Sequence, residues 1–302
     1  MRIVTRPDYD GIVCAVLLYE ALGITQEIFW TEPNEVQTGS APIQDGDILA
    51  NLPHDARCSV WFDHHVSNTP DVPVEGGFEI APSAAGVVYR YYQNQGKLDH
   101  TYDDLVEWTD AIDSADLSME QVLHPENYDH VILSMTIQNR GYEDIPYWNH
   151  LVELLRRLPM DQVMADAQVK ERVARAIEQN QTFSRHLTDH TQIHGQISVT
   201  DFRDLDPVPS GNRFLTYCLF PETMASIKIR YKGPEKDKVL ISVGHSIFNK
   251  VCRVNTGHML SRYGGGGHFG AGGCTLEPDT AQTHIDEILA LLLKNQPLPE
   301  TD

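Results

Sequence analysis

The chain has 302 residues, of which 41% are hydrophobic, and it carries a formal net charge of −20. This length is sufficient for two hydrophobic cores. Such acidity argues against binding to long duplex nucleic acid, because basic side chains that neutralise phosphates supply much of that affinity. It is compatible with a small phosphorylated substrate that is held by metal ions and by a few arginine or lysine residues.

The chain has five cysteines and no C-x-x-C pair, which favours buried, reduced thiols over disulfides. Its first residues lead directly to Asp8 and Asp10 without the pattern of a secretion signal. No apolar segment is long enough to span a membrane. We therefore expect a soluble, cytoplasmic protein with no membrane partner. The sequence leaves open whether it is a monomer or a homodimer.

Short apolar segments alternate with polar loops and helical patterns in the N-terminal part of the chain. A helix is predicted over residues 12–22, and Ser83 is a favourable N-cap for a second helix that carries Tyr91 and Tyr92. This alternation predicts an α/β fold with a doubly wound parallel sheet. The predicted strands are residues 2–5, 28–30, 48–50 and 59–62.

The middle of the chain, from Tyr102 to about Gln181, has a mostly helical pattern. Pro146 is predicted to begin a helix at Tyr147. Residues 160–183 lack glycine and proline and are predicted to form one long helix, followed by a loop at 186–194.

The pattern of the C-terminal part predicts a second, smaller α/β domain. We place the boundary near residues 184–195, with an N-terminal domain and helical linker at 1–183 and a C-terminal domain at 196–302. The predicted elements are strands 196–200, 226–231 and 239–243 and a closing helix at 285–293.

Asp8 and Asp10 follow the first predicted strand, and Gly11 frees the backbone before the next helix. Parallel sheets place their chemistry at the carboxyl ends of the strands. A turn at this point can aim both carboxylates at neighbouring metal ions. The alternative is a structural turn in which an aspartate caps the helix.

Asp63, His64 and His65 directly follow the predicted strand 59–62. Carboxylate and imidazole ligands suit Mn²⁺, and also Zn²⁺ or Fe²⁺. These residues therefore form a candidate metal corner, and the alternative is a surface loop with two solvated histidines.

A further acidic segment ends in Asp113-Ser114, with Asp110 one turn earlier. Residues at i and i+3 share a helix face, so one can be a metal ligand and the other a support. The alternative is a solvated acidic helix face.

Gly264–Gly267 precede His268, and a second glycine-rich segment follows at 270–273. So many glycines predict that this segment is neither a helix nor the interior of a strand. We expect its backbone N–H groups to cradle a phosphate, with His268 donating to a phosphoryl oxygen. Arg253 and Arg262 are candidates to bind the phosphate bidentately. The alternative is a flexible hinge.

The ordered motifs Asp8-x-Asp10, Asp63-His64-His65 and Gly264–His268 resemble those of the DHH/DHHA1 phosphoesterase superfamily. This superfamily includes RecJ-like exonucleases, nano-RNases, cyclic-dinucleotide phosphodiesterases and exopolyphosphatase-like proteins. The resemblance covers Asp8–Asp113 for the DHH domain and about 200–293 for the DHHA1 domain.

The resemblance implies a role for each motif residue. Asp63 is implied as a ligand or as the group that orients an imidazole, and His65 as the residue near the reacting phosphate. Mn²⁺ is the expected cofactor, with Mg²⁺ or another divalent ion as the alternative. The implied metal ligands are Asp8, Asp10, His64 and Asp113, and the implied substrate-binding residues are Gly265, Gly266, Gly267, His268, Arg253 and Arg262.

The chain departs from the superfamily pattern at two positions. Val4 stands where many members carry a metal-binding histidine, and Asn51 where many carry an aspartate that bridges two metals. A neutral amide is a poorer bridge, because it does not offset the repulsion between two cations. We therefore predict one firm metal site, and one weak or substrate-assisted site at Asp8 with Asn51 as its remaining ligand. His54 or Asp55 are candidates to compensate.

The resemblance implies a metal-dependent phosphoesterase that hydrolyses short oligonucleotides or linear dinucleotides to mononucleotides. An aromatic residue in the cleft, Tyr263 or Phe269, would favour a nucleotide substrate. The nearest alternative is an exopolyphosphatase-like enzyme, for which Lys228, Arg230 and Lys232 are candidate ligands; a solvated edge strand explains them equally well. A second alternative is a nucleotide-binding protein with a degraded metal centre.

Overall fold

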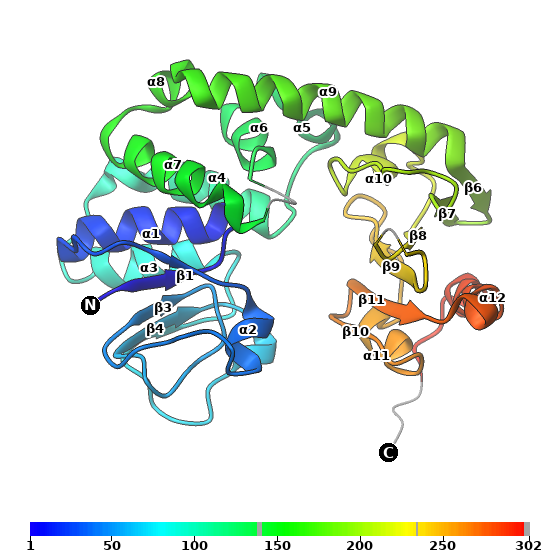
Figure 1. Ribbon diagram of the computed structural model, residues 1–302, viewed down its shortest axis with the longest axis horizontal. Coiled ribbons are helices and arrows are strands. Elements are labelled where there is room, and N and C mark those ends of the chain that lie inside the picture. Colours follow the sequence, from blue (N-terminus) through cyan, green and yellow to red (C-terminus); the bar gives the residue numbers. More distant parts are fainter. Residues whose placement is uncertain (138–140, 234, 299–302) are drawn as a thin grey trace. The chain divides into compact units, whose positions relative to one another are not determined.

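The computed structural model describes residues 1–137, 141–233 and 235–298 (Figure 1). The chain divides into two compact units. The first comprises residues 1–117 and 124–175, and the second comprises residues 118–123 and the chain from 176 onward. The division falls within the long helix α9 (Ala167–His190).

The first unit is built on a five-stranded, wholly parallel sheet in the order β2-β1-β3-β4-β5. The strand order reverses beside β1, which is the doubly wound pattern, and such sheets bind ligands at the carboxyl ends of the strands at this reversal. The predicted fold class is thus confirmed, and the four predicted strands agree to within one residue. The strands are β1 (Ile3–Thr5), β2 (Phe29–Trp30), β3 (Ile48–Ala50), β4 (Val60–Asp63) and β5 (Gly76–Phe78).

Helices cover one face of this sheet in two layers (Figure 1). α1 (Tyr9–Leu22) and α3 (Ala84–Gln93) pack side by side against the strands. α4 (Asp103–Asp113) packs against both of them, and α7 (Ile145–Arg157) packs against α1. The other helices of this unit are α2 (Pro33–Gln37), α6 (Asp129–Met135) and α8 (Met160–Ala165), with single 3₁₀ turns at Val66–Asn68, His100–Tyr102, Pro125–Asn127 and Tyr142–Asp144.

The opposite face of the sheet is covered by α2 and loops. Val4, Leu49 and Trp61 point to this side. They form a cluster with Val36, Ala41, Ile43 and Leu52. Trp61 stacks on Phe78 with the ring centroids 5.6 Å apart. Both faces of the sheet are therefore buried, as near-continuous apolar strands predict.

Two predicted helix starts are confirmed, and one predicted helix is wrong in its extent. The Ser83 hydroxyl accepts a hydrogen bond from Gly86 N at 2.9 Å, and Pro146 lies in the first turn of α7. Residues 160–183 do not form one helix, because Asp166 is extended (ψ 140°) and separates α8 from α9. Its carboxylate accepts from the backbone N–H groups of Gln168 and Val169, and aspartate favours such caps over helix interiors.

The loop predicted at 186–194 is also wrong. α9 continues to His190, and residues 191–194 form the strand β6, which pairs with β7 (Ile197–Asp201). The segment contains no glycine or proline before Gly195, so nothing in its chemistry ends the helix earlier.

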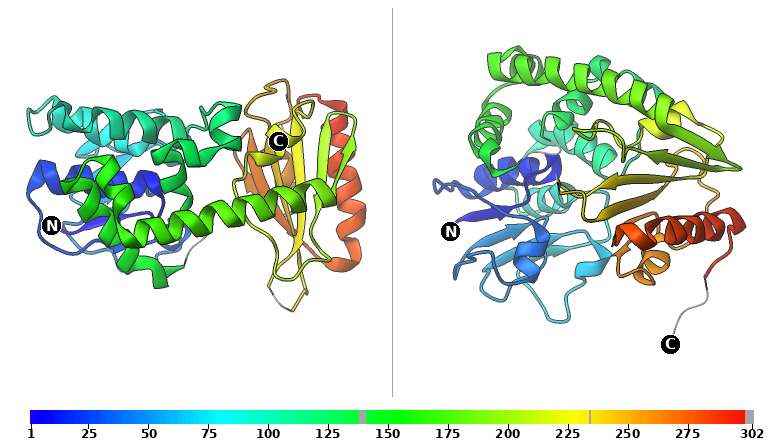
Figure 2. Two further views of the ribbon diagram at one scale, coloured as in Figure 1. Left: turned by 90° about the horizontal axis from the view of Figure 1, so that it is seen from above. Right: turned by 45° about the vertical axis from the view of Figure 1, so that its right-hand side comes forward.

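The second unit is built on a six-stranded mixed sheet in the order β10-β11-β9-β8-β7-β6. β7 and β8 pair in parallel, and the other neighbours are antiparallel. α12 (Pro278–Lys294) lies along one face of this sheet and buries Ile285, Ile288 and Leu292 in the core (Figure 2). The remaining elements are α5 (Met119–Leu123), α10 (Leu215–Leu219), β8 (Ala225–Tyr231), β9 (Val239–His245), α11 (Thr256–Ser261), β10 (Gly266–Gly267) and β11 (Ala271–Leu276).

The glycine-rich segment forms strands, so the prediction that it cannot do so is wrong. Gly266 and Gly267 pair with Gly273 and Gly272 in a hairpin. A Cβ on Gly267 would lie 2.3 Å from the Ala271 carbonyl oxygen, and one on Gly272 would lie 2.4 Å from the Gly266 carbonyl oxygen. Gly267 and Gly272 are therefore required because the hairpin backbones approach so closely. Among the residues described, no helix combines the length and apolarity needed to cross a lipid bilayer.

Candidate functional site

The turn between β1 and α1 positions Asp8 and Asp10. Asp8 is the N-cap of α1, and its Oδ1 accepts a hydrogen bond from Gly11 N at 2.8 Å. Asp10 lies in the first helical turn and is buried. Its two carboxylate oxygens accept from Ala84 N at 2.9 Å and Ala85 N at 2.8 Å, which are the first amides of α3. The structural and functional interpretations of this motif thus coexist, since Asp8 caps the helix while Asp10 is held at the N-terminus of α3.

His64 lies at the carboxyl end of β4, directly after its last residue. Its Nδ1 lies 2.9 Å from the Ala81 carbonyl oxygen. An acceptor at that distance places a proton on Nδ1, and in the neutral ring Nε2 then carries the lone pair. Nε2 is buried, has no hydrogen-bond partner among the described residues, and lies 3.4 Å from Asp113 Oδ2 and 3.8 Å from Asp10 Oδ2.

Asp10, His64 and Asp113 together fit a divalent cation. One ligand atom from each lies within 4.8 Å of the others. Burial raises the pKa of Asp10 well above its usual value, and the nearby carboxylates of Asp113 and Asp8 raise it further. A cation among these groups would reverse both effects, because it stabilises the ionised carboxylates. The donor set of two carboxylates and one imidazole suits Mn²⁺.

The choice between Asp113 and Asp110 is clear from the geometry. Asp113 lies beside His64, whereas Asp110 Oδ1 accepts a hydrogen bond from the Ser83 hydroxyl. Asp110 also lies close to Gly86, where an added Cβ would be 2.8 Å from its Oδ1. Asp110 therefore anchors the start of α3, and through it the amides that hold Asp10.

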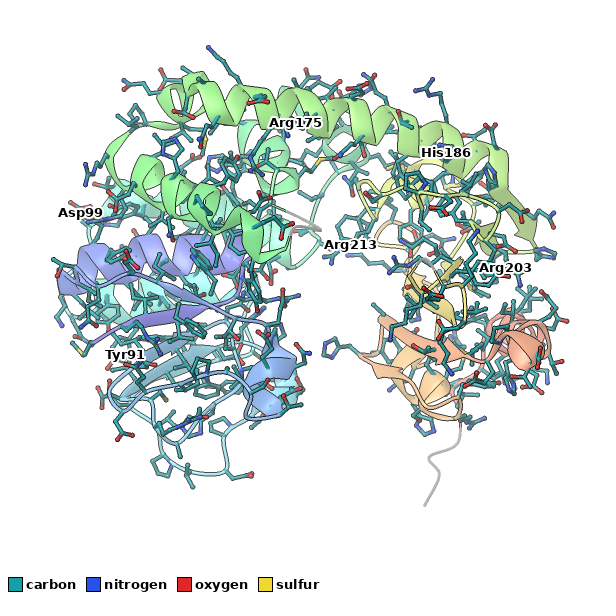
Figure 3. All side chains as sticks on the ribbon, viewed as in Figure 1. Tyr91, Asp99, Arg175, His186, Arg203 and Arg213 are labelled. Atoms are coloured by element: carbon teal, nitrogen blue, oxygen red, sulfur yellow. The ribbon has the colours of Figure 1, made fainter. Side chains whose placement is uncertain are left out.

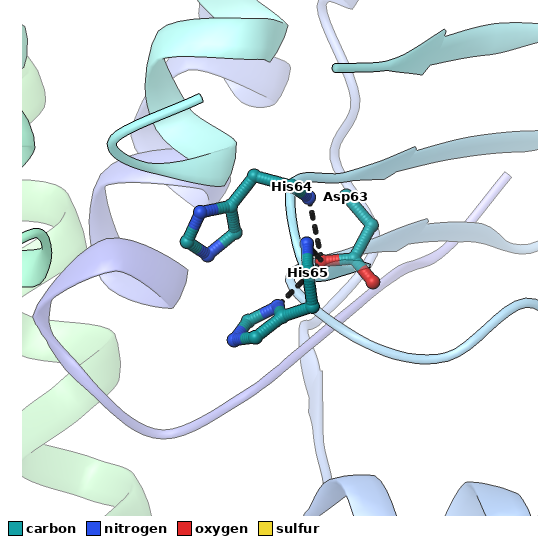
Figure 4. A group of neighbouring side chains, drawn as sticks. All are labelled: Asp63, His64 and His65. Atoms are coloured by element: carbon teal, nitrogen blue, oxygen red, sulfur yellow. Dashed lines mark hydrogen bonds and ion pairs between the residues drawn. The ribbon is translucent and has the colours of Figure 1, made fainter. Parts of the chain in front are cut away.

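Asp63 is fully buried and engaged by donors around it (Figure 4). Its Oδ1 accepts from His64 N at 2.8 Å and lies 2.8 Å from Nδ1 of the His65 ring. Its Oδ2 accepts from Asn68 Nδ2 at 2.6 Å. The His64 ring points away from this carboxylate, so Asp63 orients His65. The sequence did not point to Asn68. Its only link to the motif along the chain is its position, five residues after Asp63.

The Asp63 carboxylate also sets the charge of His65. The hydrogen bond that the His65 ring donates to Asp63 raises the pKa of His65, and this outweighs the opposing effect of burial. The raised pKa favours the protonated ring, in which Nε2 can donate a proton. The His64 and His65 rings meet edge to face with centroids 4.1 Å apart, which places this donor beside the candidate metal centre.

Asn51 follows β3 in a left-handed conformation with φ 57°. Its Nδ2 donates to Asp8 Oδ1 at 2.9 Å. Its Oδ1 is buried and has no hydrogen-bond partner within the described part of the chain. Of the residues considered as compensation, His54 packs edge-on against Trp61 and Asp55 pairs with Arg57.

Arg6 is a site residue that sequence reasoning did not identify. Its Nη1 lies 3.2 Å from Asp8 Oδ2, and its Nε lies 3.4 Å from Glu32 Oε2. The available signal was a basic residue two positions before an aspartate at a strand end.

In the second unit, His268, Arg253 and Arg262 have exposed side chains. The backbone N–H groups of Gly264, Gly265 and His268 already donate to carbonyl oxygens, with distances of 3.1, 3.0 and 2.7 Å. The amides that remain for an anion are therefore fewer than a free glycine loop would offer, and the side chains become more important.

The two aromatic residues proposed to stack on a base lie in different environments. Phe269 is 55% exposed, and its ring meets His245 edge to face with centroids 5.4 Å apart. Tyr263 is partly buried against the core of the second unit and the His284 ring. Phe269 is the one that can stack on a base in solvent.

The basic residues on β8 do not lie on an edge strand, so that interpretation is wrong: β8 pairs on both sides, with β7 and β9. Lys228 is half-buried with its Nζ 6.0 Å from the Phe183 ring centroid, and burial lowers its pKa. Arg203, on the loop after β7, is paired with Asp201 (Figure 3).

No protein-family model matches the chain, and a search of curated proteins gave no match. Solved structures do match. A pGpG-specific phosphodiesterase from Vibrio cholerae superposes with a TM-score of 0.83 at 28% identity, over 98% of this chain and 99% of that chain.

Two more distant structures share the fold. RecJ from Thermus thermophilus, solved in complex with Mn²⁺, gives a TM-score of 0.59 at 14% identity, over 99% of this chain and 52% of RecJ. An exopolyphosphatase-related protein from Bacteroides fragilis gives 0.55 at 12% identity, over 96% of this chain and 91% of that chain. With the motif residues and the site geometry, these similarities identify the chain as a hydrolase that belongs to the DHH/DHHA1 phosphoesterase superfamily.

Proposed function

We propose that the protein is a metal-dependent phosphodiesterase that cleaves linear dinucleotides such as pGpG, and other very short oligonucleotides, to mononucleotides. The observation that carries the metal dependence is the buried Nε2 of His64, a lone pair without a hydrogen-bond partner in the described residues, between the carboxylates of Asp10 and Asp113. The full-length similarity to a pGpG-specific phosphodiesterase supports the substrate class.

The site residues of the first unit have distinct roles in this proposal. Asp10, His64 and Asp113 would hold the cation, which supplies a nucleophilic water at neutral pH and polarises a phosphoryl oxygen. His65, whose pKa is raised by its hydrogen bond to Asp63, would donate a proton to the departing nucleoside oxygen. Mn²⁺ is the proposed ion, with Mg²⁺ as the alternative.

The second unit would bind the remainder of the substrate. Phe269 would stack on a base, and His268, Arg253 and Arg262 would bind the non-reacting phosphate. The net charge of −20 supports short substrates, because a long polyanion is repelled before it meets these few cations.

Polyphosphate is the less favoured substrate. A polyphosphate chain requires a row of accessible cations. Arg230 and Lys232 are exposed, but Lys228 is half-buried and next to an aromatic ring, which interrupts the row. The exposed phenyl ring of Phe269 in the glycine-rich hairpin, in contrast, suits a base, because aromatic side chains stack on bases.

The test is release of GMP from pGpG by the Mn²⁺-loaded protein, followed by chromatography, with a longer oligonucleotide and polyphosphate in parallel. We expect GMP from pGpG, slower cleavage of the longer chain, and no product with His64→Ala. Absence of GMP with the metal-loaded wild-type protein would contradict the proposal, and phosphate release from polyphosphate alone would replace it.

Phe269→Ala tests the nucleotide specificity directly. Base stacking on an aromatic side chain contributes about 1–3 kcal/mol, so we expect KM for pGpG to rise about 10-fold or more with little change in kcat. Ile193→Ala removes another partly exposed apolar side chain of the same unit and serves as the matched control.

A further inference from the structure

The carboxylate of Asp8 is already occupied by donors from the protein. Its Oδ1 accepts from Gly11 N at 2.8 Å and from Asn51 Nδ2 at 2.9 Å. Its Oδ2 lies 3.2 Å from Arg6 Nη1. The two N–H donors and the guanidinium compete with a metal ion for this carboxylate, and the positive guanidinium repels such an ion, so this side of the centre does not favour a second divalent cation.

Asn51 is the residue that makes this arrangement stable. An amide N–H can approach Asp8 Oδ1 to 2.9 Å, whereas a carboxylate at the same position would repel Asp8 unless a cation lay between them. The hydrogen bond from Asn51 thus stabilises Asp8 without a second metal ion.

Arg6 brings a fixed positive charge to the same place. Burial lowers its pKa, but the carboxylates of Asp8, Glu32 and Asp113 together outweigh this and raise the pKa, so the guanidinium stays charged. The same guanidinium acts on the charge of His65. Arg6 is therefore close to both the candidate metal ligands and the candidate proton donor.

Arg6 reduces the need for a second metal ion at this centre. Asp8, Asp10 and Asp113 act on one another as like charges, and Glu32 adds a further carboxylate beside Arg6. A divalent ion and a guanidinium together offset most of this negative charge. Two divalent ions beside Arg6 would add cation–cation repulsion instead.

The guanidinium also has unused donors. The contacts with Asp8 and Glu32 at 3.2 and 3.4 Å involve Nη1 and Nε, and a guanidinium carries five N–H donors in all. The side chain is 39% exposed, so a substrate can reach it. Guanidinium groups bind phosphoryl oxygens bidentately and stabilise the charge that develops on them during cleavage.

We propose that Arg6 is the second cation of this catalytic centre: held by Asp8 and Glu32, it binds the scissile phosphoryl group beside a single divalent ion at Asp10, His64 and Asp113. The phosphoryl contact rests on the proposed phosphodiesterase function, whereas the metal count does not. Glu32 and Asp8 are then positioning residues for Arg6.

The metal count is tested by native mass spectrometry of the full-length protein at saturating Mn²⁺. We expect one Mn²⁺ per chain in the wild type and in Arg57→Gln, a control that removes another aspartate-paired arginine from the same unit. We expect two in the double variant Arg6→Gln/Asn51→Asp, because it removes the guanidinium and adds a carboxylate. Two ions in the wild type would overturn the proposal, whatever the substrate is.

The phosphoryl contact is tested by kinetics on pGpG. Arg6→Gln should lower kcat about 100-fold, as loss of a charge-stabilising donor does, and Arg6→Lys should recover part of it. Unchanged thermal unfolding of the Mn²⁺-loaded Arg6→Lys variant separates this effect from misfolding. A wild-type kcat in Arg6→Gln would overturn the phosphoryl contact, even if the metal count is one.

Discussion

The Asp63 carboxylate lies 2.8 Å from Nδ1 of His65, and it is fully buried at the end of β4. Asp63→Asn would keep the shape of the side chain but remove the charge that raises the pKa of His65. We expect kcat to fall about 100-fold, the usual size of a general-acid contribution. The Mn²⁺ content should not change, because Asp63 does not face His64 Nε2. Loss of metal together with activity would instead make Asp63 a ligand.

Metal should stabilise the protein through the carboxylates of the first unit. Asp10 is buried beside Asp8 and Asp113, and its pKa is raised by that burial and repulsion. Mn²⁺ should therefore raise the Tm, and a chelator should lower it again. In His64→Ala the increase should be lost, whereas in His100→Ala, which removes an exposed histidine, it should persist. An equal increase in all three proteins would show that the ion binds elsewhere.

His130 should make stability depend on pH. Its Nδ1 lies 2.8 Å from the Tyr9 hydroxyl, its Nε2 lies 3.0 Å from Asp104, and its ring stacks on Trp108. Burial lowers the pKa of His130 below its ordinary value of 6.5. The stability that it contributes is therefore present above pH 6.5 and is lost as pH falls towards the folded-state pKa.

The comparison with His130→Gln isolates this effect. The difference in unfolding free energy between wild type and variant should be largest above pH 6.5 and should shrink as the solution is acidified, in urea titrations at several pH values. A difference that grows on acidification would mean that the folded state holds the charged imidazole.

Two glycines of the second unit should differ sharply when replaced by alanine. A Cβ on Gly257 would lie 2.3 Å from the Gly267 carbonyl oxygen, whereas one on Gly266 would meet no atom within 4 Å. Gly257→Ala should destabilise the protein by about 1–3 kcal/mol, the usual cost of overpacking. Gly266→Ala should cost about 1 kcal/mol or less. Equal losses in thermal unfolding would show that the hairpin adjusts to both side chains.

The sequence predicted the parts of the site that depend on local pattern. Asp8, Asp10 and His64 drew attention because they follow predicted strands, and the resemblance to the superfamily implied that they and Asp113 are metal ligands. Asn68 and Arg6 were missed because their roles come from contacts with the carboxylates of Asp63 and Asp8. Such contacts leave no periodic pattern in the sequence. The hairpin strands were missed for a related reason: a glycine disfavours a strand on its own, but the approach of two backbones reverses the preference.

The segment that begins α3 contains no proposed ligand, yet it controls two of them. The Ala81 carbonyl fixes the tautomer of His64, and the amides of Ala84 and Ala85 fix the rotamer of Asp10. A shift of this short stretch would therefore disturb both ligands at once. The affinity of the centre for its ion should therefore depend on the conformation of this one loop. Substitutions in the loop would tune or abolish metal binding without any change in the motif residues.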